Sequence, residues 1–126
     1  MSRVLLVDNN PADQRLFIRA VEANRPDCDV EAVADIDGAV AFLNAGGKAD
    51  LVVLDAHFIG PAGAETVRRL RCAAQSPVPL IVFCESQIFA EIAEVHALGA
   101  MWFRMPFNVL KYFQVVGKIL AFMKTE

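Results

Sequence analysis

The stretch Ala49-Asp50-Leu51-Val52-Val53-Leu54-Asp55 decides the fold. Its four consecutive apolar residues are typical of a strand that is buried on both faces, as in the middle of a parallel sheet. The strand ends on Asp55, and strands of such sheets deliver their C-terminal residues to the crevice in which open α/β folds bind ligands. The run from Arg3 to Asp8 repeats this pattern and also ends on an acid. Two buried strands that carry acids at matching ends are therefore the main clue to function.

Length and composition limit the possible classes of protein. The 126 residues suit one domain over residues 1–126, and no apolar run approaches the roughly 18 residues that cross a bilayer, so we expect no membrane insertion. A net charge of -3 offers no basic surface, so we expect no direct binding of nucleic acid. Three cysteines without metal-ligand spacing, and no signal-peptide pattern, favour a reduced, cytoplasmic setting.

The remainder of the chain alternates predicted helices with predicted strands. Apolar periodicity, capping residues and Gly or Pro breaks predict helices from Asn10-Pro11 to about residue 24, from Asp35 to Gly46, around Val67 and Leu70, over about 88–98, and from Asn108 onward. Further strands are predicted at about 29–33, 80–84 and 101–104. Five strands in strict alternation with five helices imply an α/β fold with a doubly wound parallel sheet.

The strand at residues 29–33 suits an edge of the sheet, because it is short and carries Asp29 and Glu31. An edge position there gives the flavodoxin-like strand order 2-1-3-4-5, whose switch point lies between the first and third strands. Those two strands end in Asp8 and Asp55. We therefore expect both carboxylates in one crevice at the C-terminal edge of the sheet.

Two carboxylates in one crevice repel each other unless a cation lies between them. Mg2+ takes oxygen ligands and commonly binds one or two carboxylates, waters and a phosphate oxygen, so Asp8, Asp55 and a loop carbonyl near His57 suit it. The imidazole of His57 is a weaker candidate, because no second His or Cys stands at ligand spacing. Beside Mg2+, an exposed Asp carboxylate is also able to accept a phosphoryl group as an acyl phosphate.

From about Arg3 to Met123 the chain resembles the receiver domain of two-component response regulators. The matching features are Leu-Leu-Val-Asp-Asn at residues 5–9, Asp-Leu-Val-Val-Leu-Asp at 50–55, Gly63, Gly99-Ala100 and Pro106-Phe107. The resemblance implies that Asp55 is the phosphoacceptor of a phosphorelay, that Asp8 and the backbone carbonyl of His57 bind Mg2+, and that the Met105-Pro106 peptide is cis. It also implies a regulator that is not an enzyme, with a histidine kinase or phosphotransfer protein upstream and a protein partner downstream.

Several residues depart from the receiver pattern near the implied site. Asn9 stands where the family usually has a second acid, so it is at most a weak ligand and we expect weak Mg2+ binding. The switch position that usually holds Thr or Ser is Cys84, a poorer hydrogen-bond donor. Glu85 replaces a small residue next to it and would repel an incoming phosphate. These changes predict impaired phosphotransfer.

The segment after residue 99 also departs from the family. Met105 replaces the Lys that usually contacts the phosphoryl group, and Arg104 is the nearest cation in sequence. A shift by one residue along a strand turns a side chain to the other face of the sheet, which weakens Arg104 as a substitute. The switch aromatic of the family aligns best with Phe103, which lacks a hydroxyl.

Three classes of function are therefore open. The first is a phosphorylatable receiver with output through the surface formed by the fourth helix, the fifth strand and the fifth helix. The second is a pseudo-receiver that binds or dimerises with proteins independently of phosphate. The third is a flavodoxin-like enzyme that binds a small molecule, which is the weakest because the loop after Asp8 has no Gly-rich phosphate cradle.

The last predicted helix has a broader apolar surface than packing on one sheet requires. One stripe is predicted to pack on the sheet, and it consists of Val109, Phe113, Val116, Leu120 and Met123. A second stripe beside it predicts an interface with a partner or a second copy, and it consists of Tyr112, Val115, Ile119 and Phe122. We therefore expect the fourth and fifth helices to bind a partner or to form a homodimer with a second copy.

Overall fold

The structure is a computed structural model, and it describes residues 2–55, 63–74, 77–85 and 89–123. The strands are β1 (Arg3–Val7), β2 (Asp29–Val33), β3 (Leu51–Leu54), β4 (Leu80–Cys84) and β5 (Met101–Arg104). The helices are α1 (Pro11–Asn24), α2 (Ile36–Asn44), α3 (Gly63–Ala73), α4 (Phe89–Ala97) and α5 (Val109–Leu120). Every predicted strand and helix is present near its predicted position.

The five strands form one parallel sheet in the order β2-β1-β3-β4-β5. The flavodoxin-like order and the edge position of β2 are therefore confirmed. The central strands β1, β3 and β4 are almost wholly buried, whereas β2 and β5 are partly exposed. This difference explains why continuous apolar runs stand in the middle of the sheet, where both faces are covered.

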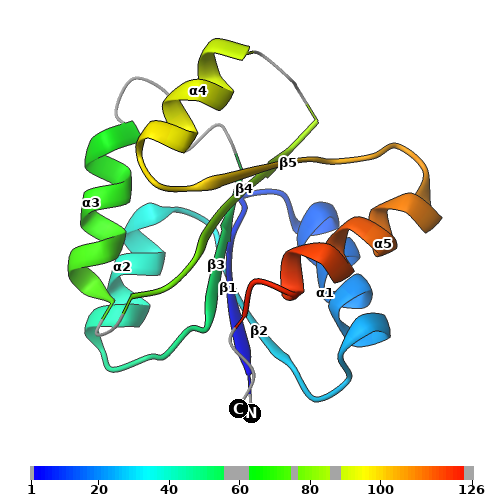
Figure 1. The fold of residues 1–126 in the computed structure, drawn as a ribbon. Helices are drawn as coiled ribbons and strands as arrows, with labels where there is room; N and C mark the ends of the chain where they lie inside the picture. Colours follow the sequence, from blue (N-terminus) through cyan, green and yellow to red (C-terminus); the bar gives the residue numbers. More distant parts are fainter. Residues whose placement is uncertain (1, 56–62, 75–76, 86–88, 124–126) are drawn as a thin grey trace.

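Two layers of helices cover the sheet (Figure 1). α1 and α5 lie side by side on one face, where Val4 and Leu6 of β1 join their core. α2 and α3 lie on the other face, where Leu5 and Val7 point, and Val95 of α4 belongs to this second core. The alternation follows from the pleat of a strand, which turns successive side chains to opposite faces. None of the helices in the described ranges combines the length and apolar character that a membrane span requires.

The predicted helix ends are also confirmed. The Asn10 side chain accepts hydrogen bonds from the backbone nitrogens of Ala12 and Asp13 at the start of α1. Asp35 caps α2 and Asn108 caps α5 in the same way. Gly99 follows α4 with a φ of 80°, a backbone conformation that side chains with a Cβ rarely adopt.

The prediction for the outer surface of α5 is partly wrong. Tyr112 and Ile119, which were predicted as interface residues, are 3% and 0% exposed and belong to the core beneath α1. Val115 is half-buried against that core, and Phe122 is 38% exposed. Val109, which was predicted to pack on the sheet, is 59% exposed. Val116, Leu120 and Met123 are buried as predicted, so α5 buries most of both predicted stripes.

The burial of the second stripe follows from the contact between α5 and α1. Nδ2 of Asn24, the last residue of α1, donates a hydrogen bond to the backbone oxygen of Phe113 at 2.9 Å. A Cβ added to Gly117 would lie 2.6 Å from Oδ1 of Asn24, so the two helices approach closely there. Because α5 packs on both the sheet and α1, its apolar arc is broad without any partner protein.

The Met105-Pro106 peptide is trans, because the described residues contain no cis peptide bond. The prediction of a cis bond is wrong. Cis proline persists only where tertiary contacts favour it. Here Pro106 is half-buried and the next residue, Phe107, is the most exposed of the large apolar side chains described, so packing around this turn is sparse.

Candidate functional site

Asp8 and Asp55 follow neighbouring strands directly. Val7 of β1 and Leu54 of β3 are partners in the parallel register, so the acids that follow them lie side by side at the C-terminal edge of the sheet. The backbone nitrogen of Asp8 donates to the oxygen of Val33 at 3.0 Å, and that of Asp55 donates to the oxygen of Val7 at 3.3 Å. The sheet therefore fixes the backbone of both residues.

The loop after β1 holds Asp8 in one orientation. Its Oδ1 accepts a hydrogen bond from the backbone nitrogen of Asn10 at 2.8 Å, and its backbone oxygen accepts one from Nε2 of Gln14. The side chain of Asn10 in turn caps α1. Asp8 is buried, with 6% of its surface exposed, whereas Asp55 is half-buried. Several hydrogen bonds therefore hold the buried residue Asp8 at the end of β1.

Both acids line one small cavity on the α1/α5 side of the sheet. Its volume is about 10 Å³, close to the smallest space that admits a water molecule. The described lining consists of Leu6, Asp8, Asp13, Phe17, Val53, Leu54, Asp55, Phe83, Met105 and Tyr112. The structure therefore brings Asp8 and Asp55 together, as the strand order predicts.

Two polar residues of this lining were not predicted to belong to the site of Asp8 and Asp55. Asp13 was interpreted only as an acid at the positive end of α1, yet it faces the same cavity. Tyr112 was assigned to an interface, yet its ring packs on Phe83 with centroids 5.4 Å apart. Burial raises the pKa of the Tyr112 hydroxyl, and the negative charges of Asp13 and Asp8 raise that pKa further. The hydroxyl therefore stays protonated, and it experiences the field of the acids.

A sequence signal exists for each missed residue. Asp13 lies five positions after Asp8, in the first turn of a helix that starts at the C-terminal edge of the sheet. Tyr112 lies four positions after the Asn108 cap, at the end of α5 that is nearest the same edge. In both cases a capping residue that is recognisable in the sequence marks the start of the helix. The first residues of a helix that follows a strand therefore lie near the C-terminal edge of the sheet.

The described residues suit a divalent cation only modestly. Asp8 and Asp55 supply two carboxylates, which with waters meets the usual requirement of Mg2+. Asn9 is exposed and carries no charge, and His57 lies outside the described residues. Within the part of the chain that the structure describes, no group of three or more His, Cys, Asp or Glu residues could hold a metal ion. The donor set therefore fits weak binding through two acids.

The residues of β4 and β5 divide between the two faces of the sheet. Met105 lines the cavity, and its backbone nitrogen donates to the oxygen of Cys84 at 2.7 Å. Phe103 packs on the α1/α5 side of the sheet and Trp102 on the other side. The pleat of the strand therefore places Arg104 on the same face as Trp102. Arg104 instead lines a separate groove with Phe107 and Lys111. The role of Arg104 as a substitute for Lys stays a prediction.

The two predicted switch residues have different surroundings. The Cys84 side chain is buried at the end of β4, while Glu85 after it is exposed. Phe103 is half-buried, and its ring lies edge-on to that of Phe122, with centroids 5.7 Å apart. Phe103 therefore contacts the segment after α5, and neither residue lines the described cavity of Asp8 and Asp55.

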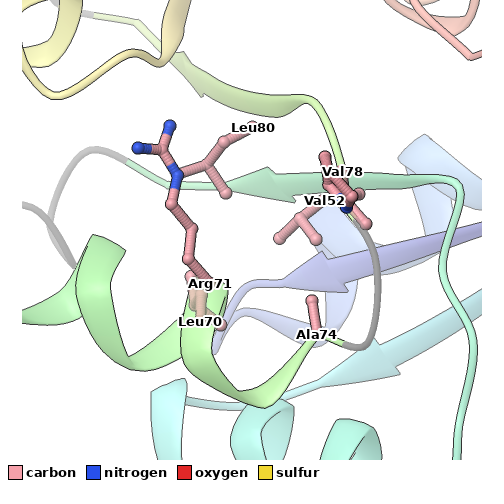
Figure 2. A pocket seen from close by; sticks show the side chains of 7 residues that line it. Val52, Leu70, Arg71, Ala74, Val78 and Leu80 are labelled. Carbon is pink, nitrogen blue, oxygen red and sulfur yellow. The ribbon is translucent and has the colours of Figure 1, made fainter.

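A larger hollow lies at the opposite end of the sheet (Figure 2). It has a volume of about 450 Å³ between α3 and the starts of β3 and β4, and it is lined by Val52, Leu70, Arg71, Ala74, Pro77, Val78 and Leu80. Nη2 of Arg71 donates to the backbone oxygen of Gly99 at 3.2 Å, which binds α3 to the turn before β5. Ligands of open α/β sheets bind at the C-terminal ends of the strands. This hollow is therefore the wrong place for a flavodoxin-like ligand.

Comparisons with solved structures identify the fold. A response regulator from Hahella chejuensis is 22% identical, with 97% of this chain and 94% of that chain covered and a TM-score of 0.80. The phosphorylated cyanobacterial phytochrome response regulator RcpA is 25% identical, with 97% and 93% covered and a TM-score of 0.78. The chain has the receiver fold. The Mn2+-bound form of the response regulator Rcp1 matches as well, at 22% identity, 100% and 97% coverage and a TM-score of 0.77.

The sequence itself gives no such match. No protein-family model matches it, and a search of curated proteins finds no relative. In the receiver fold, the cavity of Asp8 and Asp55 occupies the C-terminal edge of the sheet at its switch point. The fold therefore agrees with the resemblance that the sequence motifs indicate.

Proposed function

We propose that this protein acts as a response-regulator receiver in two-component signalling, with Asp55 as the phosphoacceptor and with impaired phosphotransfer. The observation that carries the proposal is the cavity that Asp55 shares with Asp8 and Asp13 at the end of β1 and β3. It is supported by the structural neighbours, one of which is a phosphorylated response regulator. We propose a regulatory protein rather than an enzyme, with a histidine kinase or phosphotransfer protein as the phosphoryl donor.

Mg2+ is part of this proposal, and Asp8 and Asp55 would hold it. When bound, the ion would neutralise the two carboxylates and the charge of an incoming phosphoryl group. The sheet positions Asp55 for attack by fixing its backbone, and the hydrogen bond from Asn10 orients Asp8. A structural neighbour that binds Mn2+ is consistent with a divalent ion. The neutral, exposed Asn9 supports weak affinity.

Impaired transfer is supported by three side chains. Met105 lines the cavity in place of a cation, so no charge of this residue compensates a bound phosphoryl group. Cys84 donates hydrogen bonds poorly, and Glu85 is exposed beside it, where its negative charge disfavours an approaching phosphate. The same three observations favour the second candidate function, a pseudo-receiver that binds proteins without phosphorylation.

The output surface proposed here is formed by α4, β5 and α5. Met101 on β5 and Phe122 after α5 are exposed large apolar side chains of this region, and a downstream protein or a second copy would cover them. Tyr112 and Ile119 are excluded from this surface, because they are buried.

Intact-mass spectrometry tests the proposed function. The protein is incubated with acetyl phosphate and Mg2+ for increasing times, beside Asp55→Ala and the matched control Asp27→Ala in an exposed turn. We expect a slow phosphoryl adduct on the wild type and on Asp27→Ala that is missing from Asp55→Ala. An adduct that persists in Asp55→Ala would contradict the assignment of Asp55. No adduct at any time would favour the pseudo-receiver.

A further inference from the structure

The hydroxyl group of Tyr112 is the only one contributed by a side chain to the described lining of the Asp8/Asp55 cavity. The other polar side chains of that lining are the carboxylates of Asp8, Asp13 and Asp55. Ionised carboxylates only accept hydrogen bonds, whereas a tyrosine hydroxyl donates one. Tyr112 therefore supplies a kind of group that the three acids lack.

Tyr112 is held firmly in this position. Its side chain is buried, and its ring packs on Phe83 of β4 at 5.4 Å and near Phe113 at 6.3 Å between centroids. Burial and the charges of Asp13 and Asp8 raise its pKa, so the hydroxyl remains protonated and able to donate a hydrogen bond. A donor that is fixed by packing loses little rotational freedom when it binds an anion.

A purely structural role would not require the hydroxyl. The same position is surrounded by apolar core residues such as Phe17, Phe83 and Val116, and a Phe there would pack equally well. A phenol buried near acids loses contacts with water, which is unfavourable unless a hydrogen bond replaces them. A tyrosine at a position that lines the cavity of Asp8 and Asp55 is therefore best explained by an occupant that accepts its hydrogen bond.

We propose that Tyr112 is a binding residue of the Asp55 site, and that its hydroxyl donates a hydrogen bond to the anionic group held at Asp55. This inference rests on the proposed function. The anionic group is a phosphoryl group or its mimic, beryllofluoride. Since Met105 supplies no cation, Tyr112 is the neutral donor on the α5 side of the site. Occupation of Asp55 would thereby be linked directly to the first half of α5.

The chain offers a clean probe, because it contains one tyrosine and one tryptophan. Tyrosine labelled with 13C at Cζ gives a single NMR signal that responds to hydrogen bonding of the hydroxyl. We expect this signal to shift when Mg2+ and beryllofluoride are added to the wild type, and to stay unchanged in Asp55→Asn. In the double variant Tyr112→Phe with Phe113→Tyr, the only tyrosine moves by one helix position, and its signal should not respond.

Affinity provides the second measurement. Calorimetry should find that Tyr112→Phe weakens the binding of beryllofluoride in the presence of Mg2+ by about tenfold, the usual effect of one hydrogen bond to a charged group. Binding of Mg2+ alone should change less than about twofold, because the metal is held by Asp8 and Asp55. A circular dichroism melt of Tyr112→Phe serves as the control for folding.

The outcomes separate this inference from the proposed function. Beryllofluoride could bind in a way that depends on Asp55 while the NMR signal of Tyr112 stays unchanged and Tyr112→Phe binds it as tightly as the wild type. That result would overturn the inference, but it would support the Asp55 site. Failure of the wild type to bind beryllofluoride at saturating Mg2+ would overturn both. A signal that moves equally in Asp55→Asn would also overturn the inference, since the shift would then arise elsewhere.

Discussion

Asp8 and Asp55 stand one residue beyond the paired strand residues Val7 and Leu54, and both line one cavity on the α1/α5 side of the sheet. Asp13 adds a third acid from the first turn of α1. Nearby carboxylates disfavour one another's ionised form, so a cation or a hydrogen-bond donor stabilises the group. We therefore expect the charge of this cavity to determine which ligands bind there.

The first prediction concerns Mg2+ affinity. Asn9→Asp adds a negative charge next to Asp8 at an exposed position, and we expect it to tighten Mg2+ binding about two- to fivefold, as for other exposed charge pairs. Isothermal titration calorimetry measures the effect, with Asn44→Asp at the exposed end of α2 as a control that should not alter affinity. An unchanged Asn9→Asp affinity would mean that the ion is not held at this edge of the sheet.

The second prediction concerns phosphotransfer. The triple variant Cys84→Thr, Glu85→Ala, Met105→Lys restores a hydroxyl donor, removes a negative charge and adds a cation at the cavity. We expect acetyl phosphate to label Asp55 of this variant faster than Asp55 of the wild type by at least about tenfold, which corresponds to one hydrogen bond to a charged group. Intact-mass time courses give both rates. Efficient labelling of the wild type would show that these side chains do not impair transfer.

The strands and helix ends were predictable because local physics fixes them. β3 is a continuous apolar run that only a doubly covered strand explains, and the Asn10 and Asp35 caps satisfy backbone nitrogens that a helix start leaves unpaired. The position of Asp8 beside Asp55 then follows from the strand order alone. This part of the site needed no knowledge of side-chain packing.

The surroundings of the site were less predictable, because they depend on which helices touch. The apolar arc of α5 is compatible with packing on α1, on α4 or on a partner, and only the contact of Asn24 with Phe113 decides for α1. Tyr112 is buried in this packing and lines the cavity of the acids. Periodicity identifies how wide an apolar face is, but it does not identify the neighbour that covers it.

The third prediction concerns the stability of this helix pair. Asn24→Ala removes the hydrogen bonds from Nδ2 to the backbone oxygens of Ala20 and Phe113, both 2.9 Å long. We expect the free energy of unfolding to fall by about 1 kcal/mol, chiefly through the loss of the bond between helices. Urea unfolding followed by Trp102 fluorescence measures it, with Asn44→Ala as the matched control. Equal stability of Asn24→Ala and the wild type would contradict a role for this bond.

The fourth prediction is a dependence of stability on alkaline pH. The pKa of Tyr112 is raised above its ordinary value of 10.0 by burial and by the charges of Asp13 and Asp8. Well below pH 10 the hydroxyl is protonated in both the folded and the unfolded state, and the stabilisation is fully present. As the pH rises further, the unfolded chain loses this proton while the folded protein retains it, so the free energy of unfolding falls.

Tyr112→Phe isolates this effect, since lysines that titrate in the same range are common to both proteins. Between pH 9 and pH 11, about one unit on either side of the ordinary tyrosine pKa, the wild type should lose more stability than Tyr112→Phe. Because Tyr112 is the only tyrosine, the tyrosinate absorbance of the folded protein should also develop above pH 10. Parallel loss of stability in the two proteins would contradict the prediction.

The fifth prediction concerns self-association through the surface of β5 and α5. Phe122 is 38% exposed and rests edge-on against Phe103, and Met101 on the same strand is exposed as well. A charge in such an apolar patch is unfavourable in an interface but harmless in water. We therefore expect Phe122→Glu to raise the dissociation constant of a homodimer by at least about tenfold, in the range of interface hot spots. Sedimentation equilibrium measures the constant.

The choice of residue matters for this experiment. Ile119→Glu would bury a charge in the core beneath α1, and the protein would unfold before any interface was tested. Leu110→Glu is the matched control, because Leu110 is an exposed apolar residue near the other end of α5, and it should leave the dissociation constant unchanged. If Leu110→Glu disrupts the dimer and Phe122→Glu does not, the interface lies at the start of α5 instead. A wild type that remains monomeric at high concentration would contradict self-association, and the exposed Phe122 would then be available to a different protein.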